Sequence, residues 1–392
     1  MEIDRLMRIG IDTFSFDKPG ANSGVGPSVY VWRLLPELFT VGREHTFIVF
    51  ANRENRELIP RARNVTVVIS RLPNRARPLR ILHEQVELVY QYRKHRLDGI
   101  HLLGNNICFG LASKSVLTVH DLMWKYYYDL LEYRTLKNRY FALTVPNSLK
   151  RAKALITVSR YIAGQIQETY GVPASALHPI LEASGGLSHP SPDTASQLRQ
   201  KYSFPFLFTV TTSWPHKNLP VLLEAFVLLK NKGAFTGKLV VAGQIKGSPH
   251  QATLDFIAGR GMDGQIILTG FISEEEKAYC YRSATLFVYP SLYEGFGLPL
   301  LEAMEAGTPV VASRAASIPE VGGDACAYFD PHSPGELAAQ IEQLLVDDEL
   351  RHELREKGFQ RAKQFNWRRT AEETLRVYEH CFGTDRKDIG TT

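Results

Sequence analysis

The sequence lacks the features that define several classes of protein. Its 392 residues include only four cysteines, and none of them forms a Cys-x-x-Cys pair. This argues against a disulfide framework or a structural zinc site and favours reduced thiols. No apolar run approaches the roughly 18 residues that span a bilayer, and the acidic start Met1-Glu2-Ile3-Asp4 has no signal-peptide pattern. We therefore expect a cytoplasmic protein.

What is present is typical of a globular chain. Hydrophobic residues make up 44% and charged residues 22% of the sequence, which excludes a disordered tail protein, a collagen and a coiled coil. The length predicts two domains or three, and it is sufficient to bury a sizeable core.

The net charge of +5 is unevenly distributed. Residues 53–98 contain eleven Lys and Arg residues but only five acidic ones. Such a basic stretch can meet nucleic acid, anionic lipid headgroups or a phosphorylated substrate, or it can simply be a solvated surface. Neither a nucleic-acid motif nor interleaved aromatic residues accompany it, so we do not expect a nucleic-acid partner.

Short apolar runs alternate with segments of helical periodicity, which predicts parallel sheets covered by helices on both faces. In the first half we expect strands over 8–12, 46–50, 65–69, 99–103, 116–119 and 154–158, with helices over 29–38, 81–93 and 161–170. Small residues and prolines over Gly185–Asp193 predict a hinge. A second series follows, with strands over 206–210, 238–242, 266–269, 286–290 and 310–312 and helices over 220–230, 251–258, 273–282, 299–306 and 335–345.

This pattern predicts two doubly wound α/β domains. We place the boundaries at 1–187 and 188–366, followed by a helix and a loose tail over 367–392. Ligands of such sheets bind beyond the carboxyl ends of the strands, so a central cleft between the two domains is the expected site.

Residues 289–307, which read YPSLYEGFGLPLLEAMEAG, are the most informative stretch. A predicted strand leads into a loop that carries Glu294 and two glycines, and a helix is expected to start at about Leu298. The free N–H groups and the positive end of its dipole make such a helix start an anion site. Glu302 lies about one turn inside that helix, where its carboxylate can accept hydrogen bonds from two adjacent ribose hydroxyls.

Either carboxylate alone has a simpler explanation. Glu302 could merely stabilise a helix start, and Glu294 could be a solvated loop residue. Two carboxylates eight residues apart around Gly-x-Gly-x-Pro favour a binding site instead.

The frame EGFGLPLLEAMEAGTPVVAS resembles the signature of retaining glycosyltransferases with the GT-B fold, specifically glycosyltransferase family 4 of the bacterial mannosyltransferase type that builds polysaccharides and O-antigens. The similarity continues through residues 270–271, 318–325, 330–331, 365–367 and 378. It implies two Rossmann-like domains, the first for the acceptor and the second for a nucleotide sugar. It also implies that the C-terminal helix crosses back to the N-terminal domain.

The resemblance also assigns roles to residues. Glu294 resembles the ligand of the donor sugar hydroxyls, and Glu302 resembles the ribose ligand. Lys217 resembles the lysine that neutralises the diphosphate. Further donor contacts are implied for three groups of residues, namely the backbone of Phe296, Gly297 and Leu298, the base-lining Gly270 and Phe271, and the loop residues Gly24, Val25 and Gly26.

Three points concern less specific residues. His120 follows a predicted strand and resembles the family histidine beside the donor sugar, whereas Ser159 could equally be structural. The family usually has an arginine a few residues before Lys217, but this chain does not, so either His216 or another basic group supplements the charge or Lys217 acts alone. By this resemblance, His120, Lys217 and Glu294 form the expected catalytic set.

The implied reaction moves a sugar from a nucleoside diphosphate to a hydroxyl with retention. No Asp-x-Asp occurs in the chain, so we expect neither a metal nor a further cofactor. The similarity favours GDP-mannose as donor and a growing, lipid-linked glycan as acceptor, with the stretch Arg53–Arg96 docking at the inner face of the membrane. Three alternatives are a UDP- or ADP-sugar enzyme with a soluble acceptor, a non-catalytic binding module and a nucleic-acid binder.

Overall fold

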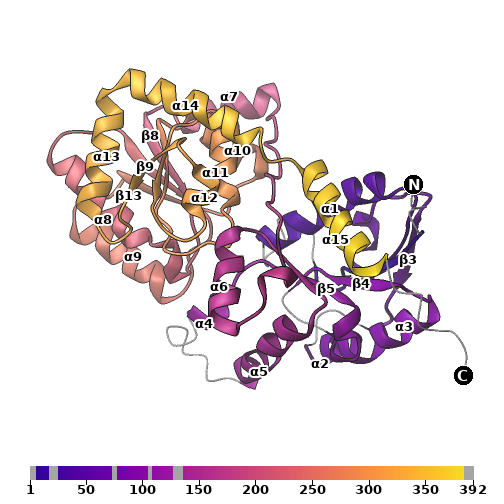
Figure 1. Ribbon diagram of the computed structural model, residues 1–392. Helices are drawn as coiled ribbons and strands as arrows, with labels where there is room; N and C mark the ends of the chain where they lie inside the picture. Colours follow the sequence, from indigo (N-terminus) through magenta and orange to yellow (C-terminus); the bar gives the residue numbers. More distant parts are fainter. Residues whose placement is uncertain (1–5, 17–24, 73–76, 105–107, 127–135, 384–392) are drawn as a thin grey trace, which may run out of the picture. The chain divides into compact units, whose positions relative to one another are not determined.

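The computed structural model describes residues 6–16, 25–72, 77–104, 108–126 and 136–383 (Figure 1). The chain forms two compact units, one of residues 1–183 with 366–392 and the other of residues 184–365. Within the described ranges, no helix combines the length and the apolar character needed to cross a membrane.

The first unit is built on a seven-stranded parallel sheet with the strand order β3-β2-β1-β4-β5-β6-β7. Its strands are β1 (Arg8–Asp12), β2 (Thr46–Ala51), β3 (Val65–Ile69), β4 (Gly99–Leu102), β5 (Ser115–Val119), β6 (Ala154–Thr157) and β7 (Leu177–Pro179). Its helices are α1 (Val25–Val41), α2 (Arg77–Leu82), α3 (Leu88–Lys94), α4 (Met123–Tyr126), α5 (Leu136–Arg151), α6 (Arg160–Tyr170) and α15 (Trp367–Phe382).

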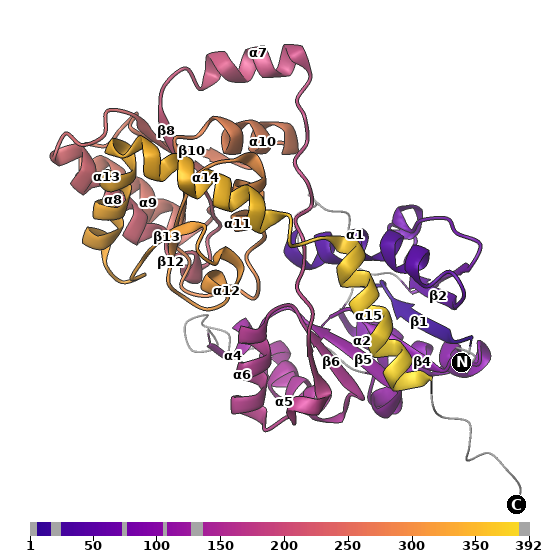
Figure 2. The same cartoon turned by 45° about the horizontal axis from the view of Figure 1, so that its top comes forward.

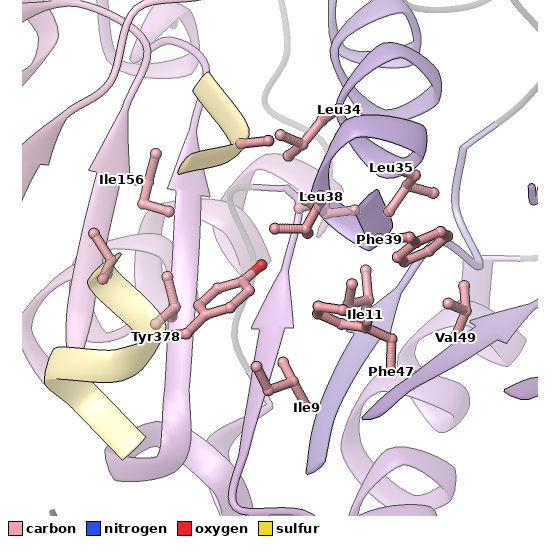
Figure 3. Close-up of a cluster of buried hydrophobic side chains, with 14 of the residues drawn as sticks. Ile9, Ile11, Leu34, Leu35, Leu38, Phe39, Phe47, Val49, Ile156 and Tyr378 are labelled. Carbon is pink, nitrogen blue, oxygen red and sulfur yellow. The ribbon is translucent and has the colours of Figure 1, made fainter. Parts of the chain in front are cut away.

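The core of the first unit lies between the sheet and two helices from opposite parts of the chain. Helices α1 and α15 lie side by side, as both views show (Figures 1 and 2). Figure 3 shows Leu38 of α1 next to Ile11 of the sheet, with Tyr378 entering from α15. The predicted C-terminal helix therefore completes the core of the N-terminal unit, because its apolar side chains replace solvent on that face.

A buried hydrogen-bond network also attaches α15 to the sheet. The Nδ1 atom of His101 contacts the hydroxyl of Tyr378, and its Nε2 atom lies 2.7 Å from Oγ1 of Thr118. Burial, with the charge of His120 as a smaller cause, lowers the pKa of His101 to about 3, so its ring is neutral at physiological pH. Buried polar groups need such partners, because an unsatisfied donor or acceptor costs stability.

The second unit repeats the same plan. Its six-stranded parallel sheet has the order β10-β9-β8-β11-β12-β13. The strands are β8 (Phe206–Val210), β9 (Lys238–Ala242), β10 (Ile266–Gly270), β11 (Leu286–Tyr289), β12 (Val310–Ser313) and β13 (Cys326–Phe329). The helices are α7 (Pro192–Lys201), α8 (Leu219–Asn231), α9 (Ser248–Gly259), α10 (Glu274–Ser283), α11 (Leu298–Ala306), α12 (Ile318–Gly322), α13 (Pro334–Val346) and α14 (Asp348–Ala362).

In both sheets the strand order reverses beside the first strand of the unit. The reversal lies between β1 and β4 in the first unit and between β8 and β11 in the second. In doubly wound sheets, ligands bind outside the carboxyl ends of the strands at this point. The predicted α/β fold class, two doubly wound domains, is confirmed, and the fold directs attention to the loops after β8 and β11.

Several elements differ from the prediction. The expected hinge Gly185–Asp193 ends inside α7, which begins at Pro192 and is capped by the side chain of Ser191. Helix α14 was missed because its charged residues obscure the apolar periodicity, although Leu354 is buried. The predicted helix over 81–93 extends from Arg77 to Lys94 and contains a π-helical turn at His83–Glu87.

Candidate active site

Two predicted residues meet at the switch point of the second sheet. Lys217 ends the 3₁₀ turn Pro215–Lys217 after β8, and Glu294 lies in the loop after β11. The Nζ atom of Lys217 donates to Oε1 of Glu294 at 2.8 Å. The two side chains are only 18% and 13% exposed, respectively. Residues 77 positions apart thus form a shielded ion pair where this fold binds ligands.

The surroundings determine which of these groups are charged. Burial raises the pKa of Glu294, but the charge of Lys217 and hydrogen bonds outweigh it, so its pKa lies below the ordinary value. For His216, burial and then the charge of Lys217 lower the pKa to about 4, against a smaller opposing effect of Glu294. His216 is therefore neutral at pH 7 and does not supply the missing arginine's charge.

Asn218 joins the loops that carry the ion pair. Its backbone is left-handed, with φ of 53°, a conformation in which asparagine is enriched among non-glycine residues. Its side-chain nitrogen donates to the carbonyl oxygens of Pro290 at 3.0 Å and Pro331 at 2.8 Å. Because these prolines follow β11 and β13, a single side chain holds three loops together at this edge of the sheet.

The glycine-rich loop leads into α11 as the sequence predicts. Gly297 caps the helix with φ of 121°, a conformation that other residues rarely adopt. The hydroxyl of buried Ser317 donates to the carbonyls of Glu294 at 2.9 Å and Phe296 at 2.8 Å. Leu298 begins the helix. The loop is thereby fixed at the N-terminus of α11, the positive end of the helix dipole.

Glu302 lies within α11 and has two partners that the sequence did not reveal. Lys277 donates to its Oε1 at 3.0 Å, and the buried Tyr281 hydroxyl donates to its Oε2 at 2.9 Å. Burial lowers the pKa of Lys277, but the charges of Glu302 and Glu274 raise it by a larger amount. The pKa of Lys277 therefore lies above its ordinary value. A carboxylate has about four acceptor positions, so Glu302 keeps the capacity to accept further hydroxyl groups.

The predicted base-lining segment ends β10. Gly270 has φ of 68°, and the side chain of Phe271 is 65% exposed. The carbonyl of Gly270 accepts from the N–H of Gly243 at 2.8 Å. A Cβ on Gly243 would lie 1.9 Å from the carbonyl oxygen of Thr211, so only glycine fits there. An isolated glycine after a strand is the signal that could have identified this close approach.

Among the first-unit predictions, Gly24 lies outside the described residues. Val25 and Gly26 form the first turn of α1 rather than a loop, and a Cβ on Gly26 would meet no atom within 4 Å. Ser159 is the N-cap of α6, where its hydroxyl accepts from the N–H of Ile162 at 3.2 Å. This contact explains Ser159 as a structural cap.

His120 follows β5 and is buried against groups from other elements. Its Nε2 atom lies 2.9 Å from the carbonyl oxygen of Leu103, and its Nδ1 atom lies 3.6 Å from Oε1 of Glu182. The ring of Tyr30 from α1 meets it edge-on, with a centroid separation of 5.0 Å. Glu182 was not predicted, although an acidic residue in the otherwise apolar run Pro179–Ala183 was a signal for it.

Comparisons with known proteins agree with this arrangement. The model for "Glycosyl transferases group 1" matches residues 193–361, and that for "Glycosyltransferase Family 4" matches residues 25–181. O-antigen chain mannosyltransferase B of Escherichia coli is 31% identical over 326 residues, or 79% of this chain and 84% of that protein. The chain is thus a glycosyltransferase. It belongs to glycosyltransferase family 4, which confirms the predicted resemblance.

Other relatives and solved structures extend the comparison. The serotype-specific mannosyltransferase WbdA of Escherichia coli is 30% identical over 272 residues, and the match spans 66% of this chain but 32% of that protein. The structure of sucrose-phosphate synthase from Thermosynechococcus elongatus superposes with a TM-score of 0.73 at 21% identity, covering 96% of this chain and 99% of that chain. WaaG, a glycosyltransferase involved in lipopolysaccharide biosynthesis, gives 0.70 at 16% identity, covering 96% and 100%. These structures share the GT-B fold.

Proposed function

We propose that this glycosyltransferase transfers mannose from GDP-mannose to a hydroxyl group of a growing glycan, with retention of anomeric configuration. The observation that carries the proposal is the shielded Lys217–Glu294 pair, 2.8 Å apart, at the switch point of the second sheet. Matched relatives named as O-antigen chain and serotype-specific mannosyltransferases support the choice of mannose. Their names also support a role in polysaccharide or O-antigen synthesis.

The proposed chemistry needs charge stabilisation rather than a protein nucleophile. The bond between the anomeric carbon and the phosphate oxygen breaks, and its electron pair passes to the diphosphate. The acceptor oxygen bonds to the same face of the sugar, and its proton moves to the leaving phosphate oxygen. Lys217 and the N-terminus of α11 stabilise the developing negative charge, while Glu294 binds sugar hydroxyls and Glu302 binds the ribose.

We further propose that these protein groups act in place of a bound metal. Among the described residues, no group of three or more His, Cys, Asp and Glu side chains is arranged to hold a metal ion. Lys217 supplies a cation that remains next to the proposed diphosphate site throughout the reaction. Activity should therefore persist when divalent ions are chelated.

The experiment is a donor panel with chelator. The purified protein is titrated calorimetrically with GDP, UDP, ADP and their sugar conjugates in EDTA, then assayed with mannosylated lipid-linked acceptors. We expect selective binding of GDP-mannose, transfer in EDTA, and a product with the anomeric configuration of the donor. Selective use of a UDP- or ADP-sugar would overturn the donor, an inverted product would overturn retention, and transfer only with added metal would overturn metal independence.

If the protein transferred sugar only to soluble acceptors, the proposal that its acceptor is a lipid-linked glycan would be wrong. Nucleotide binding without transfer to either acceptor class would support a non-catalytic module instead.

A lipid-linked acceptor requires contact with a membrane, and we propose that the first unit provides it. Leu82, Val86 and Tyr90 recur every fourth residue along Arg77–Lys94 and are 43%, 57% and 60% exposed. The Nζ atom of Lys94 lies 5.8 Å from the ring centroid of Tyr90, and Arg93 is also exposed. An outward apolar row flanked by cations suits an anionic bilayer surface.

Val86→Asp should weaken binding to vesicles of anionic phospholipid by about tenfold, since it removes apolar contact and adds repulsion. Vesicle flotation measures this, with Leu254→Asp as the control because Leu254 is an exposed apolar residue of α9 in the other unit. The proposed surface would be contradicted if Val86→Asp bound anionic vesicles as well as the wild type does. It would also be contradicted if the wild type bound neutral vesicles as well as anionic ones.

A further inference from the structure

Two buried hydroxyl groups beside the Lys217–Glu294 pair have no part in the function proposed above. Tyr289 ends β11 and is fully buried, and Ser291 lies two residues further on and is 1% exposed. Among the residues that the structure describes, neither hydroxyl has a hydrogen-bond partner. A buried hydroxyl without a partner costs stability, so these two groups call for a physical explanation.

Both hydroxyls belong to residues that lie next to the ion pair. The Nζ atom of Lys217 is 2.8 Å from Oε1 of Glu294 and 5.9 Å from the centroid of the Tyr289 ring. Burial raises the pKa of Tyr289 well above its ordinary value, and the carboxylate of Glu294 adds to this rise. Against the effect of burial, Lys217 and more weakly the Ser291 hydroxyl lower the pKa of Glu294. Two further donors thus lie close to this carboxylate without bonding to it.

A bound diphosphate competes with Glu294 for Lys217. The diphosphate carries more negative charge than one carboxylate, and the ammonium group of lysine sits on a flexible four-carbon stem, so it can turn from one anion to the other. Glu294 then loses its ion-pair partner in a shielded place, where its side chain is only 13% exposed. An unpaired charge in such a place is strongly destabilising unless other groups form hydrogen bonds to it.

We infer that Tyr289 and Ser291 are positioning residues whose hydroxyls donate to Glu294 once the diphosphate of the donor has taken Lys217 from it. They keep the carboxylate ionised and fixed where it accepts the hydroxyl groups of the sugar. A carboxylate has about four acceptor positions, so it can serve these two donors and the sugar together. The inference rests on the proposed function for the ligand that takes Lys217, but the response of Glu294 to the loss of Lys217 is testable without any ligand.

Thermal unfolding of the ligand-free protein provides that test. In the wild type, Tyr289→Phe removes a hydroxyl that has no partner, so the melting temperature should stay within about 1 °C or rise. Lys217→Met removes the ammonium group but keeps an apolar stem, and the Tyr289 hydroxyl should then bond to Glu294. In that background Tyr289→Phe should lower the melting temperature by about 3–6 °C, because a hydrogen bond to a charged group is lost.

A binding measurement does not depend on whether Lys217→Met folds. GDP has the diphosphate of the proposed donor but no sugar, so it should take Lys217 without offering hydroxyl groups of a sugar to Glu294. Calorimetric titration with GDP should show that Tyr289→Phe and Ser291→Ala each weaken binding by about fivefold. Neither substitution should lower the melting temperature of the ligand-free protein. A residue that only packs would give the opposite pattern, with lost stability and unchanged affinity.

The matched control for both measurements is Tyr328→Phe. Tyr328 lies in β13 of the same unit and is not part of the proposed donor site, and its hydroxyl donates to the carbonyl oxygen of Gly323 at 2.8 Å. This substitution removes a hydroxyl that already has a partner. It should therefore lower the melting temperature equally in the wild type and in Lys217→Met, and it should leave the affinity for GDP unchanged.

Three results would overturn the inference. An equal fall in melting temperature for Tyr289→Phe in both backgrounds would mean that the hydroxyl has a partner whether or not Lys217 is present. No fall in Lys217→Met would mean that the hydroxyl does not reach Glu294. Unchanged GDP affinity in Tyr289→Phe would mean that the diphosphate leaves the ion pair intact. If the wild type does not bind GDP, the proposed donor fails, while the melting temperatures still decide whether Tyr289 supports Glu294.

Discussion

Replacing Lys217 by alanine is expected to lower kcat by about 10²–10³-fold and to change the donor KM much less. Negative charge on the diphosphate grows as the glycosidic bond breaks, so a cation beside it stabilises the transition state more than the bound donor. His216 does not compensate, because its pKa of about 4 leaves it neutral. Steady-state kinetics with saturating acceptor measure both constants.

The control for this variant is Lys232→Ala. Lys232 caps the C-terminal end of α8 and pairs with Glu342 at 2.5 Å on the surface. The Lys232→Ala variant should have the kcat and donor KM of the wild type. Lys217→Ala also leaves the carboxylate of Glu294 without its ion-pair partner in a shielded place, so thermal unfolding must be measured to ensure that assays use folded protein. A folded variant that loses donor affinity with unchanged kcat would contradict a transition-state role for Lys217.

Replacing Glu302 by alanine is expected to weaken donor binding by about 1–3 kcal/mol, or roughly 5- to 150-fold in Kd. The carboxylate is 13% exposed and is held by Lys277 and Tyr281. It can therefore offer its remaining acceptor positions to the ribose with little loss of side-chain freedom. Calorimetric titration with the nucleoside diphosphate and with the complete donor should show the same loss for both, because the ribose is common to them.

Glu305→Ala is the appropriate comparison on the same helix. Glu305 contacts the hydroxyl of Ser184 and does not belong to the proposed donor site, so its removal should leave donor affinity unchanged. Removing Glu302 also deprives the Tyr281 hydroxyl of its acceptor, and removing Glu305 does the same to the Ser184 hydroxyl, so thermal unfolding is measured for both variants. Unchanged donor affinity in folded Glu302→Ala would rule out the ribose contact.

The fold could be predicted where local pattern and tertiary environment agree. The strands β1 and β8 were predicted with their observed limits, because apolar runs of this kind are buried in parallel sheets. The limits of β3 were also predicted, although its side chains are partly exposed, because it is rich in β-branched residues. Strand β7 was missed because it has only three residues and ends in proline, and β13 was missed because its Cys-Ala-Tyr-Phe sequence has no β-branched residue. Such short segments become strands by pairing with β6 and β12, and no local pattern encodes that pairing.

For the candidate site, the spacing around a helix start singled out Glu294 and Glu302, whereas only the resemblance to glycosyltransferase family 4 singled out Lys217. The partners that orient them did not stand out. Lys277 resembles any lysine of a charged helix until the fold places its Nζ atom 3.0 Å from Glu302. Likewise, the sequence does not show that Glu182 lies beside His120. Only the pairing of the strands that precede the two residues, β7 and β5, through β6 brings them together. These contacts depend on which elements become neighbours.

The placement of α15 has a consequence for how the chain is made. Residues 184–365 form a compact unit that interrupts the first one, whose core requires Tyr378 and Phe382. During synthesis, the second unit can therefore fold as soon as it leaves the ribosome. The first unit cannot complete its core until α15 has been made, and until then the apolar face that α15 covers stays exposed. A nascent chain that ends at Asn366 and is tethered to the ribosome by a linker long enough to clear the exit tunnel should display a protease-resistant second unit and a protease-sensitive first unit. This reverses the usual order, in which the earlier-synthesised domain matures first.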